Sequence, residues 1–435
     1  MTRRKDSLPG VRRASKPVIL LVLLSLLSLA ARAAWLGEPC HRPCRTAADH
    51  LLIFDETYYV NAARVIAGVH VPAGAPYADA PVGVDPNAEH PQLAKLIIAG
   101  SIEAFGDGPV AWRLGSLVFG TLAIIGLFVL VRAAGGGEPP ALGAATLMAA
   151  DNLLLVHGRI GTLDIYAVAF MIWALALYLR GHPLGAGTLI GVGACVKLVV
   201  PYALLALLLY EGGHFALRRR DAAIRLRRLA ACAALAAIAL IGVLALLDAI
   251  APPYDQAVHA RLAGGPFTHI SHMLSFAAGQ VSTGGPRGIA SYPWQWFGDY
   301  KPITYLNIVP DRPAPGLAHV HPASHFLGVV SPPILLLALP ALVLAALSAR
   351  RSATELDVLA LAWSVGTWLP FELLSALWRR TSYLYYMVIV MPGIYVAIAR
   401  LLTRPEVRRR AVPLALWIAA VVSALVLLYP FTPLP

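Results

Sequence analysis

The number of membrane crossings depends on residues 184–211, LGAGTLIGVGACVKLVVPYALLALLLYE. Three basic clusters follow this run, at 218–228, 350–351 and 404–410. If the run is one helix, the first cluster lies outside and the later ones fall on inconsistent sides, against the positive-inside rule. If the run is two short segments broken near Lys197 and Pro201, all three clusters become cytoplasmic. The sequence therefore favours two segments, with Lys197 at the outer end of the first rather than in mid-membrane.

The rest of the chain is also dominated by apolar runs. Hydrophobic residues make up 58% of the 435 residues and charged residues only 13%, which excludes a soluble globule and a disordered chain. The other runs lie near 17–35, 109–132, 139–156, 164–180, 229–250, 326–348, 357–377, 383–402 and 412–430. Since a spanning helix needs roughly 20 apolar residues, the sequence predicts an all-α polytopic membrane protein with about 11 transmembrane helices. Residues 1–435 then form a single integral-membrane domain.

The first apolar run follows a basic N-terminus. Its cations are Arg3, Arg4, Lys5, Arg12, Arg13 and Lys16. A cleaved signal peptide is one interpretation, because residues 30–34 offer small side chains for cleavage. The length of the run favours a retained helix with a cytoplasmic N-terminus, in the plasma membrane. Two polar connections, 37–107 and 251–325, then lie outside, and we expect the chemistry there. The excess of 35 Lys and Arg over 23 Asp and Glu records this orientation and predicts no nucleic-acid partner.

Cysteines and histidines in these connections raise the question of a metal. Cys40 and Cys44 flank His41 in Cys-His-Arg-Pro-Cys, and we favour a disulfide or free thiols because two further zinc ligands are missing. The second connection holds His269, His272, His319, His321 and His325. Their spacing matches no metal-ligand pattern, so we interpret them as loop-surface residues or acceptor contacts. We predict no metal and no other cofactor.

Two neighbouring carboxylates, Asp55 and Glu56, precede an amphipathic stretch that ends at Gly68. One interpretation is that Asp55 caps a helix whose first turn favours Glu56. The other is that one carboxylate faces a site as a general base. Because neighbouring helical residues point about 100° apart, only one of the two is expected to do so.

Cations and a further acid follow in the sequence. Lys95 closes His90-Pro-Gln-Leu-Ala-Lys95, and Arg113 opens the second crossing. Either these cations snorkel at the interface, or they lie at headgroup depth where a lipid phosphate would bind. Arg159 is followed by Asp164 before the fourth crossing. An acid there is costly and indicates function, although Asp164 could also pair with Arg159 or cap the helix.

The order of these motifs resembles that of the protein O-mannosyltransferase family, glycosyltransferase family 39, which has the GT-C fold. Later motifs agree with the bacterial type of this family: Ser291-Tyr-Pro-Trp-Gln-Trp296, Lys301-Pro-Ile-Thr-Tyr305 and Arg380-Thr-Ser-Tyr-Leu-Tyr-Tyr386. The resemblance runs from about Phe54 to Arg400.

The resemblance implies transfer of a sugar from a polyprenyl phosphate to Ser or Thr hydroxyls of exported proteins, and mannose is the sugar that it favours. It implies Asp55 as base, with Glu56 supporting substrate binding, and Arg113 as the ligand of the lipid phosphate. The remaining candidate residues have supporting roles. They are the further cations Lys95, Arg159 and Lys197, the second acidic or acceptor site Asp164 with His90, and the loop aromatics Trp294, Trp296 and Tyr305. These aromatics either cover the site or form an interfacial belt.

The chemistry expected of such a site is modest. A lipid phosphate is already a stable leaving group, so one carboxylate base suffices, and a single displacement inverts the anomeric centre. Two alternatives stay open: the same donor with a lipid or cell-wall glycan acceptor, and a transporter or flippase for a lipid-linked sugar. A transporter is expected to show midplane polar sites and related halves, whereas here the acids gather at one external edge. The expected partners are the donor lipid, an exported or membrane-bound acceptor protein, and membrane lipids.

Overall fold

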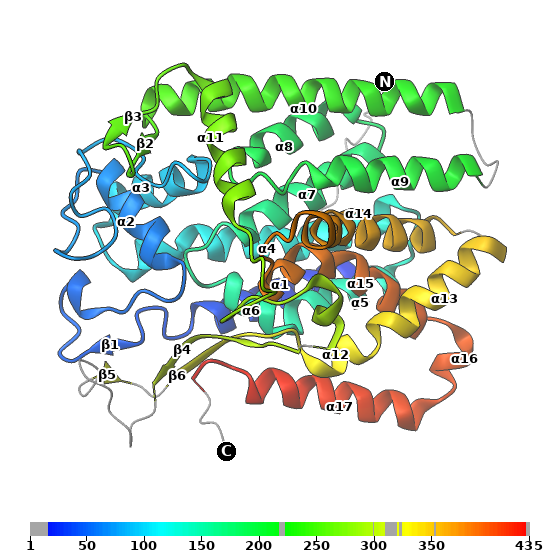
Figure 1. Cartoon of the computed structure of the whole chain (residues 1–435). Coiled ribbons are helices and arrows are strands. Elements are labelled where there is room, and N and C mark those ends of the chain that lie inside the picture. Colours follow the sequence, from blue (N-terminus) through cyan, green and yellow to red (C-terminus); the bar gives the residue numbers. More distant parts are fainter. Residues whose placement is uncertain are drawn as a thin grey trace, which may run out of the picture.

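The computed structural model describes residues 16–216, 222–298, 300–308, 320–321, 324–351 and 354–431. Long helices dominate this part of the chain and run side by side (Figure 1). The helices of the bundle are α1 (Lys16–Ala33), α4 (Pro109–Ala133), α5 (Glu138–Ala150), α6 (Asn152–His157), α7 (Asp164–Leu179), α8 (Pro183–Ala194), α9 (Tyr202–Ala216), α10 (Ala222–Ile250), α12 (Pro332–Leu336), α13 (Ala338–Arg351), α14 (Glu355–Trp378), α15 (Met387–Leu402), α16 (Pro405–Arg408) and α17 (Ala411–Leu427). The connections add α2 (Glu56–Ile66), α3 (Leu93–Phe105), α11 (Pro266–Gly279) and the 3-10 helices η1 (Ala47–Asp49) and η2 (Pro293–Gly298). A third 3-10 helix, η3 (Leu384–Tyr386), lies between α14 and α15.

The predicted helical membrane fold is confirmed. Among the described residues, six helical stretches are long and apolar enough to cross a membrane, and α7, α8 and α17 are shorter apolar helices. The six are Lys16–Ala33, Pro109–Ala133, Arg225–Ile250, Pro332–Arg351, Glu355–Trp378 and Leu384–Leu402. Two predicted runs differ in detail. The run 139–156 is two helices, because Asp151 ends α5 and caps α6, and the run from 326 begins as a strand and becomes helical only at Pro332.

The run 184–211 is broken as predicted. Helix α8 ends at Ala194 and α9 begins at Tyr202, so Lys197 lies in the break between them. Helix α8 packs closely on α10 through two glycines. A Cβ atom on Gly187 would lie 2.3 Å from the carbonyl oxygen of Cys232, and one on Gly191 would lie 2.4 Å from that of Ala236. These small residues let the two helices approach each other closely.

The two long connections meet at one end of the bundle, on the left of Figure 1. Strand β1 (Cys40–His41) pairs with β5 (Val320–His321), and the main-chain N–H of Asp85 donates to Pro252. The second connection also contains the hairpin β2 (Tyr254–Asp255) and β3 (Ala260–Arg261), and the pair β4 (Ile303–Ile308) and β6 (Ser324–Gly328). Both connections therefore lie on the same side, as the charge pattern required. Which side faces the cytoplasm stays a prediction, and the arginines at 3–13 and 218–220 lie outside the described residues.

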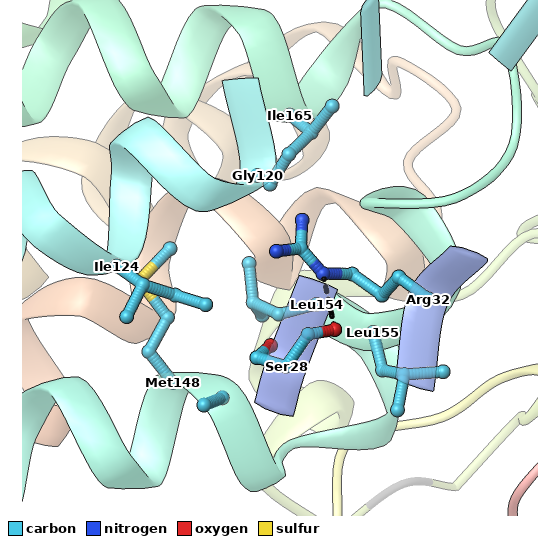
Figure 2. Close-up of a pocket in the computed structure, with 9 residues that line it drawn as sticks. Ser28, Arg32, Gly120, Ile124, Met148, Leu154, Leu155 and Ile165 are labelled. Atoms are coloured by element: carbon cyan, nitrogen blue, oxygen red, sulfur yellow. Dashed lines mark hydrogen bonds between the residues drawn. The ribbon is translucent and has the colours of Figure 1, made fainter. Parts of the chain in front are cut away.

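Helix α1 is tied into the bundle by a buried arginine near its C-terminal end. Arg32 donates from Nε to the Ser28 carbonyl (3.1 Å), from Nη1 to that of Leu117 (3.3 Å) and from Nη2 to Thr121 Oγ1 (2.8 Å). Figure 2 shows its side chain beside Gly120, where a Cβ atom would lie 1.9 Å from Nη1. Arg32 thus joins α1 to α4, and the retention of α1 stays a prediction.

The cysteines and histidines of the connections have structural roles. Cys40 and Cys44 form a disulfide, so neither sulfur is a thiolate that a metal could bind. The histidines of the second connection were interpreted as loop-surface residues or acceptor contacts, and the surface interpretation is wrong for His269 and His325, which are buried. His269 lies between Asp248 Oδ1 (2.8 Å) and the carbonyl oxygen of Ala88 (3.1 Å) and so joins the two connections. The side chains of His319 and His321 lie outside the described residues.

Candidate active site

Asp55 lies at the turn that opens α2. The residue before it, Phe54, has φ 55°, a left-handed conformation that is costly for a bulky side chain and is found where surrounding structure enforces it. Asp55 occupies the N-cap position, yet its side chain accepts no capping hydrogen bond. Burial raises the pKa of this carboxyl to about 7, the charge of Lys197 lowers it and that of Asp164 raises it. Asp55 is therefore a carboxylate poised to take up a proton near neutral pH, and it does not act as a cap.

A buried ion pair lies near Asp55. Lys197 Nζ lies 2.6 Å from Asp164 Oδ1, and the ammonium lies 5.4 Å from the ring centres of Tyr385 and Tyr386. Asp164 is the first residue of α7, and Lys197 comes from the α8–α9 break. The sequence offered Arg159 as the partner of Asp164. That pairing is wrong, because the helix break brings Lys197 to this position.

Tyr305 joins the second connection to this cluster. Its hydroxyl lies 2.8 Å from His157 Nε2, and its ring stacks on Phe54 with 4.0 Å between ring centres. His157 Nδ1 lies 3.2 Å from Thr162 Oγ1 and 3.9 Å from Asp164 Oδ2. Of the predicted loop aromatics, Tyr305 thus contacts the neighbours of the carboxylates, Phe54 and His157. The sequence alone indicates no role for His157, which is a single histidine between two predicted crossings.

The other two loop aromatics lie elsewhere. Trp296 is fully buried and packs on Phe371 and Tyr386, with its indole N–H donated to Ser291 Oγ (3.0 Å). Trp296 therefore supports the wall of the site. Trp294 is about half exposed and stacks on Tyr292 with 4.2 Å between ring centres.

His90 and Arg380 lie at the edge of the cluster. The His90 ring packs edge to face on Tyr59 at 5.8 Å. Its pKa lies well below the usual value because the ring is buried and because the charges of Lys197, Lys95 and Arg380 act on it. His90 is therefore neutral at pH 7. Arg380 donates from Nε to the carbonyl of Ala277 (3.2 Å). In the sequence Arg380 is only the first residue of an aromatic motif, and the fold brings its charge close enough to act on His90.

Arg113 and Glu56, two of the predicted site residues, form a buried ion pair. Arg113 Nε and Nη2 lie 2.8 Å from the two carboxylate oxygens of Glu56. Its remaining N–H groups donate to the carbonyls of Leu36, Glu38 and Leu51, so all five donors of the guanidinium are used. Glu56 also accepts from the main-chain N–H groups of Ile53 (2.8 Å) and Gly161 (2.7 Å). Arg113 has no donor left for a lipid phosphate, and Glu56 is not free to bind substrate.

Lys95 is also used within the protein. Its ammonium donates to Asp85 Oδ2 (2.6 Å) and to the carbonyls of Asn87 (2.6 Å) and His90 (2.8 Å). These three bonds exhaust the donors of a lysine. Lys95 thus fixes the chain between Asp85 and His90, and its predicted contact with the donor phosphate stays a prediction.

Arg159 contacts the segment that follows α1 and the C-terminal segment of the described chain. Its Nη2 donates to the carbonyls of Ala34 (2.9 Å) and Trp35 (3.3 Å). Its guanidinium lies 4.8 Å from the ring centre of Phe431. These contacts join the end of α1 to the C-terminal segment, and the predicted contact of Arg159 with the donor phosphate stays a prediction.

The fold is that of the GT-C class of membrane glycosyltransferases. The structure resembles the Saccharomyces cerevisiae protein O-mannosyltransferase Pmt1–Pmt2 complex bound to the sugar donor, with a TM-score of 0.69 over 97% of this chain and 91% of that chain, at 10% identity. It also resembles ArnT from Cupriavidus metallidurans bound to undecaprenyl phosphate, with a TM-score of 0.58 over 93% of this chain and 63% of that chain, at 17% identity. At such identities these likenesses establish the fold alone.

The sequence itself points to one family of this class. Residues 89–247 match the family model described as dolichyl-phosphate-mannose-protein mannosyltransferase. A polyprenol-phosphate-mannose–protein mannosyltransferase from Corynebacterium glutamicum is 33% identical over 132 residues, which are 30% of this chain and 25% of that protein. The matched region thus spans about a quarter of the curated relative. The predicted resemblance to this family is confirmed.

Proposed function

We propose that this protein transfers a mannosyl group from a polyprenyl phosphate to a Ser or Thr hydroxyl of an exported polypeptide. One observation carries the proposal. Asp55 is a carboxylate without a capping bond, with a pKa of about 7, beside a buried lysine and a second carboxylate. A base that titrates near the working pH is the group that such a transfer needs.

Asp55 takes the proton of the acceptor hydroxyl. The hydroxyl oxygen bonds to the anomeric carbon of the sugar as the bond from that carbon to the lipid phosphate breaks. The phosphate leaves with the electron pair and needs no general acid, because it is already a weak base. One displacement of this kind inverts the anomeric centre. The reaction as written uses no cofactor.

Lys197, one of the cations predicted from the sequence to bind the donor phosphate, and Arg380, which the sequence did not suggest, are the phosphate ligands in this proposal. Among the described residues, the Lys197 ammonium makes one hydrogen bond, to Asp164, although it has three N–H donors. The Arg380 guanidinium makes one, from Nε. Their charges act on His90 from the same cluster, so both can stabilise charge that develops on a leaving phosphate.

The relatives support the donor class. The name of the Corynebacterium relative gives polyprenol-phosphate mannose as donor and protein as acceptor, and the matched ArnT structure holds undecaprenyl phosphate. The direct test is transfer of labelled mannose by the reconstituted protein to a Ser/Thr peptide, with the anomeric configuration of product and donor compared. Label in a glycan or lipid but not in the peptide would contradict the proposed acceptor, and retained configuration would contradict the single displacement.

The pH dependence of transfer should report Asp55. Because its pKa is about 7, the carboxyl is protonated and inactive at pH 5 and ionised at pH 8. We expect kcat/KM to fall about tenfold for each pH unit below 7 and to level off above it. The measurement is kcat/KM for the peptide between pH 5 and 8.5. A profile that is flat down to pH 5 would show that Asp55 is not the base.

Replacement of Arg380 should weaken donor binding. Loss of one charge-assisted contact to phosphate is expected to raise the KM for polyprenyl-phosphate mannose about 10- to 100-fold in Arg380→Gln. The neighbouring arginine gives a matched control, since Arg379 is exposed and lies outside the cluster. Arg379→Gln should leave the donor KM unchanged. Equal donor KM values for both variants would remove Arg380 from the phosphate site.

A further inference from the structure

We propose that the free edge of β4 binds the acceptor polypeptide as an added strand and so presents its hydroxyl to Asp55. The inference rests on the proposed function and adds how the acceptor is recognised. Strand β4 belongs to the second connection and lies beside β6, between α6 and α17 (Figure 1).

The outer edge of β6 is already occupied. The main-chain N–H of His325 donates to the carbonyl of Pro430 (2.8 Å), and the carbonyl of Leu327 accepts from Asn152 Nδ2 (2.9 Å). The main-chain groups of His325 and Leu327 therefore point away from β4. In an antiparallel pair, residues opposite each other either bond mutually or both point outward.

The outer edge of β4 follows from this register. Asn307 is opposite His325, and Thr304 is opposite Leu327, so the main-chain groups of Asn307 and Thr304 also point outward, away from β6. Both residues are exposed. Among the described residues, no hydrogen bond joins the main chain of β4 to a strand other than β6. An unpaired edge of this kind accepts an extended chain.

A bulge links this edge to the candidate active site. The register shifts between Thr304 and Leu306, so Tyr305 is the extra residue of β4, and a bulge redirects the side chain at that position. The Tyr305 ring lies on Gly328, where a Cβ atom would be 2.4 Å from the phenol oxygen. Only glycine leaves room for this ring. From there Tyr305 reaches His157 and Phe54, so the two outward-facing residues flank the side chain that enters the site.

An acceptor paired with Thr304 and Asn307 would pass beside Tyr305. Alternate side chains of an added strand face the same side of the sheet, so every second acceptor residue would face the site. Recognition through the main chain reads no particular side chain. The occupant predicted here is therefore an extended Ser/Thr-containing segment of variable sequence, with free N–H groups on the paired side.

The first test uses the wild-type protein and a peptide whose residues are N-methylated one at a time. Each methyl group removes one main-chain donor and leaves the acceptor hydroxyl intact. We expect the peptide KM to rise about tenfold at alternate positions around the acceptor residue, which is the effect of a lost hydrogen bond, with little change between them. A scan without this alternation would overturn the edge proposal.

The second test changes the edge itself. Asn307→Pro removes an outward N–H without removing a bond to β6, and proline is tolerated at such edges. Asn307→Ala keeps the N–H and is the matched control. We expect about a tenfold higher peptide KM for Asn307→Pro at unchanged donor KM, and a near wild-type value for Asn307→Ala. If Asn307→Pro fails to fold, the methylation scan on the wild-type protein still decides.

The outcomes separate the two proposals. Peptide transfer with a flat scan overturns the edge proposal and leaves the proposed function intact. Label found only in a glycan or lipid overturns the polypeptide acceptor, and the edge proposal with it. A change of oligomeric state in detergent for Asn307→Pro, with an unchanged peptide KM, would show that the edge binds a second copy of this chain instead.

Discussion

Asp55→Asn is expected to lower mannosyl transfer about 10²- to 10⁴-fold while the protein stays folded. The amide has nearly the shape of the carboxyl but cannot take a proton, and general-base catalysis contributes about this much to rate. No capping bond is lost, because Asp55 makes none. The measurement is kcat/KM in reconstituted membranes with labelled donor and a Ser/Thr peptide.

Asp79→Asn makes the same chemical change on an exposed aspartate of the same connection and should leave transfer unaltered. Thermal unfolding gives a second readout. Burial raises the Asp55 pKa to about 7, so ionisation destabilises the folded state increasingly from about pH 4 to 7 and fully above pH 7. Asp55→Asn should therefore unfold at a higher temperature than wild type at pH 8 and not at pH 4. Transfer that survives the substitution would end the assignment of Asp55 as base.

The fold could be predicted because lipid imposes strict rules on length and charge. Apolar runs of the right length and the sides of the arginine clusters were enough to place the helices. The requirement that the basic clusters lie on the cytoplasmic side also predicted a break near Lys197. In the structure this break lies between α8 and α9. What the runs could not show was a strand such as β6, since a short apolar stretch reads equally well as the start of a helix.

The site was predicted in part, because a sequence shows which charges exist but not which are already paired. Asp55, Asp164, Lys197 and Tyr305 do gather, from four separate segments. Arg113 was expected at the phosphate, yet its donors go to Glu56 and to main-chain carbonyls. Every residue has a main-chain carbonyl group, so a sequence cannot show which of these groups accept hydrogen bonds from Arg113. In the structure, the buried Arg113 side chain therefore binds other parts of the protein.

Lys95 illustrates the same limit through a different partner. The acid that pairs with it, Asp85, lies ten positions earlier in an irregular segment. No helical or strand periodicity relates the two positions, so only the folded chain shows the pair. Arg380 is the converse case, since its position in an aromatic motif gave no hint that its charge reaches His90.

Glu56, the residue next to Asp55, is expected to matter for folding stability rather than for the proton transfer. Glu56 is fully buried, and both of its oxygens face the guanidinium of Arg113. Glu56→Gln keeps the shape but leaves a buried cation without its counter-ion, which typically costs about 3–5 kcal/mol of folding stability. We expect loss of folded protein at every pH tested, measured by thermal unfolding in detergent. Glu103→Gln, on an exposed face of α3, is the control and should unfold like wild type.

A double variant separates pairing from catalysis. Arg113→Met alone should be destabilised as Glu56→Gln is, because either change leaves one buried charge without its counter-ion. Glu56→Gln combined with Arg113→Met removes both charges, so it should lose less stability than the two single losses added together, with a coupling of about 1–3 kcal/mol. Additive losses would contradict the pair. A stable but inactive Glu56→Gln would instead place Glu56, rather than Asp55 alone, at the reacting atoms.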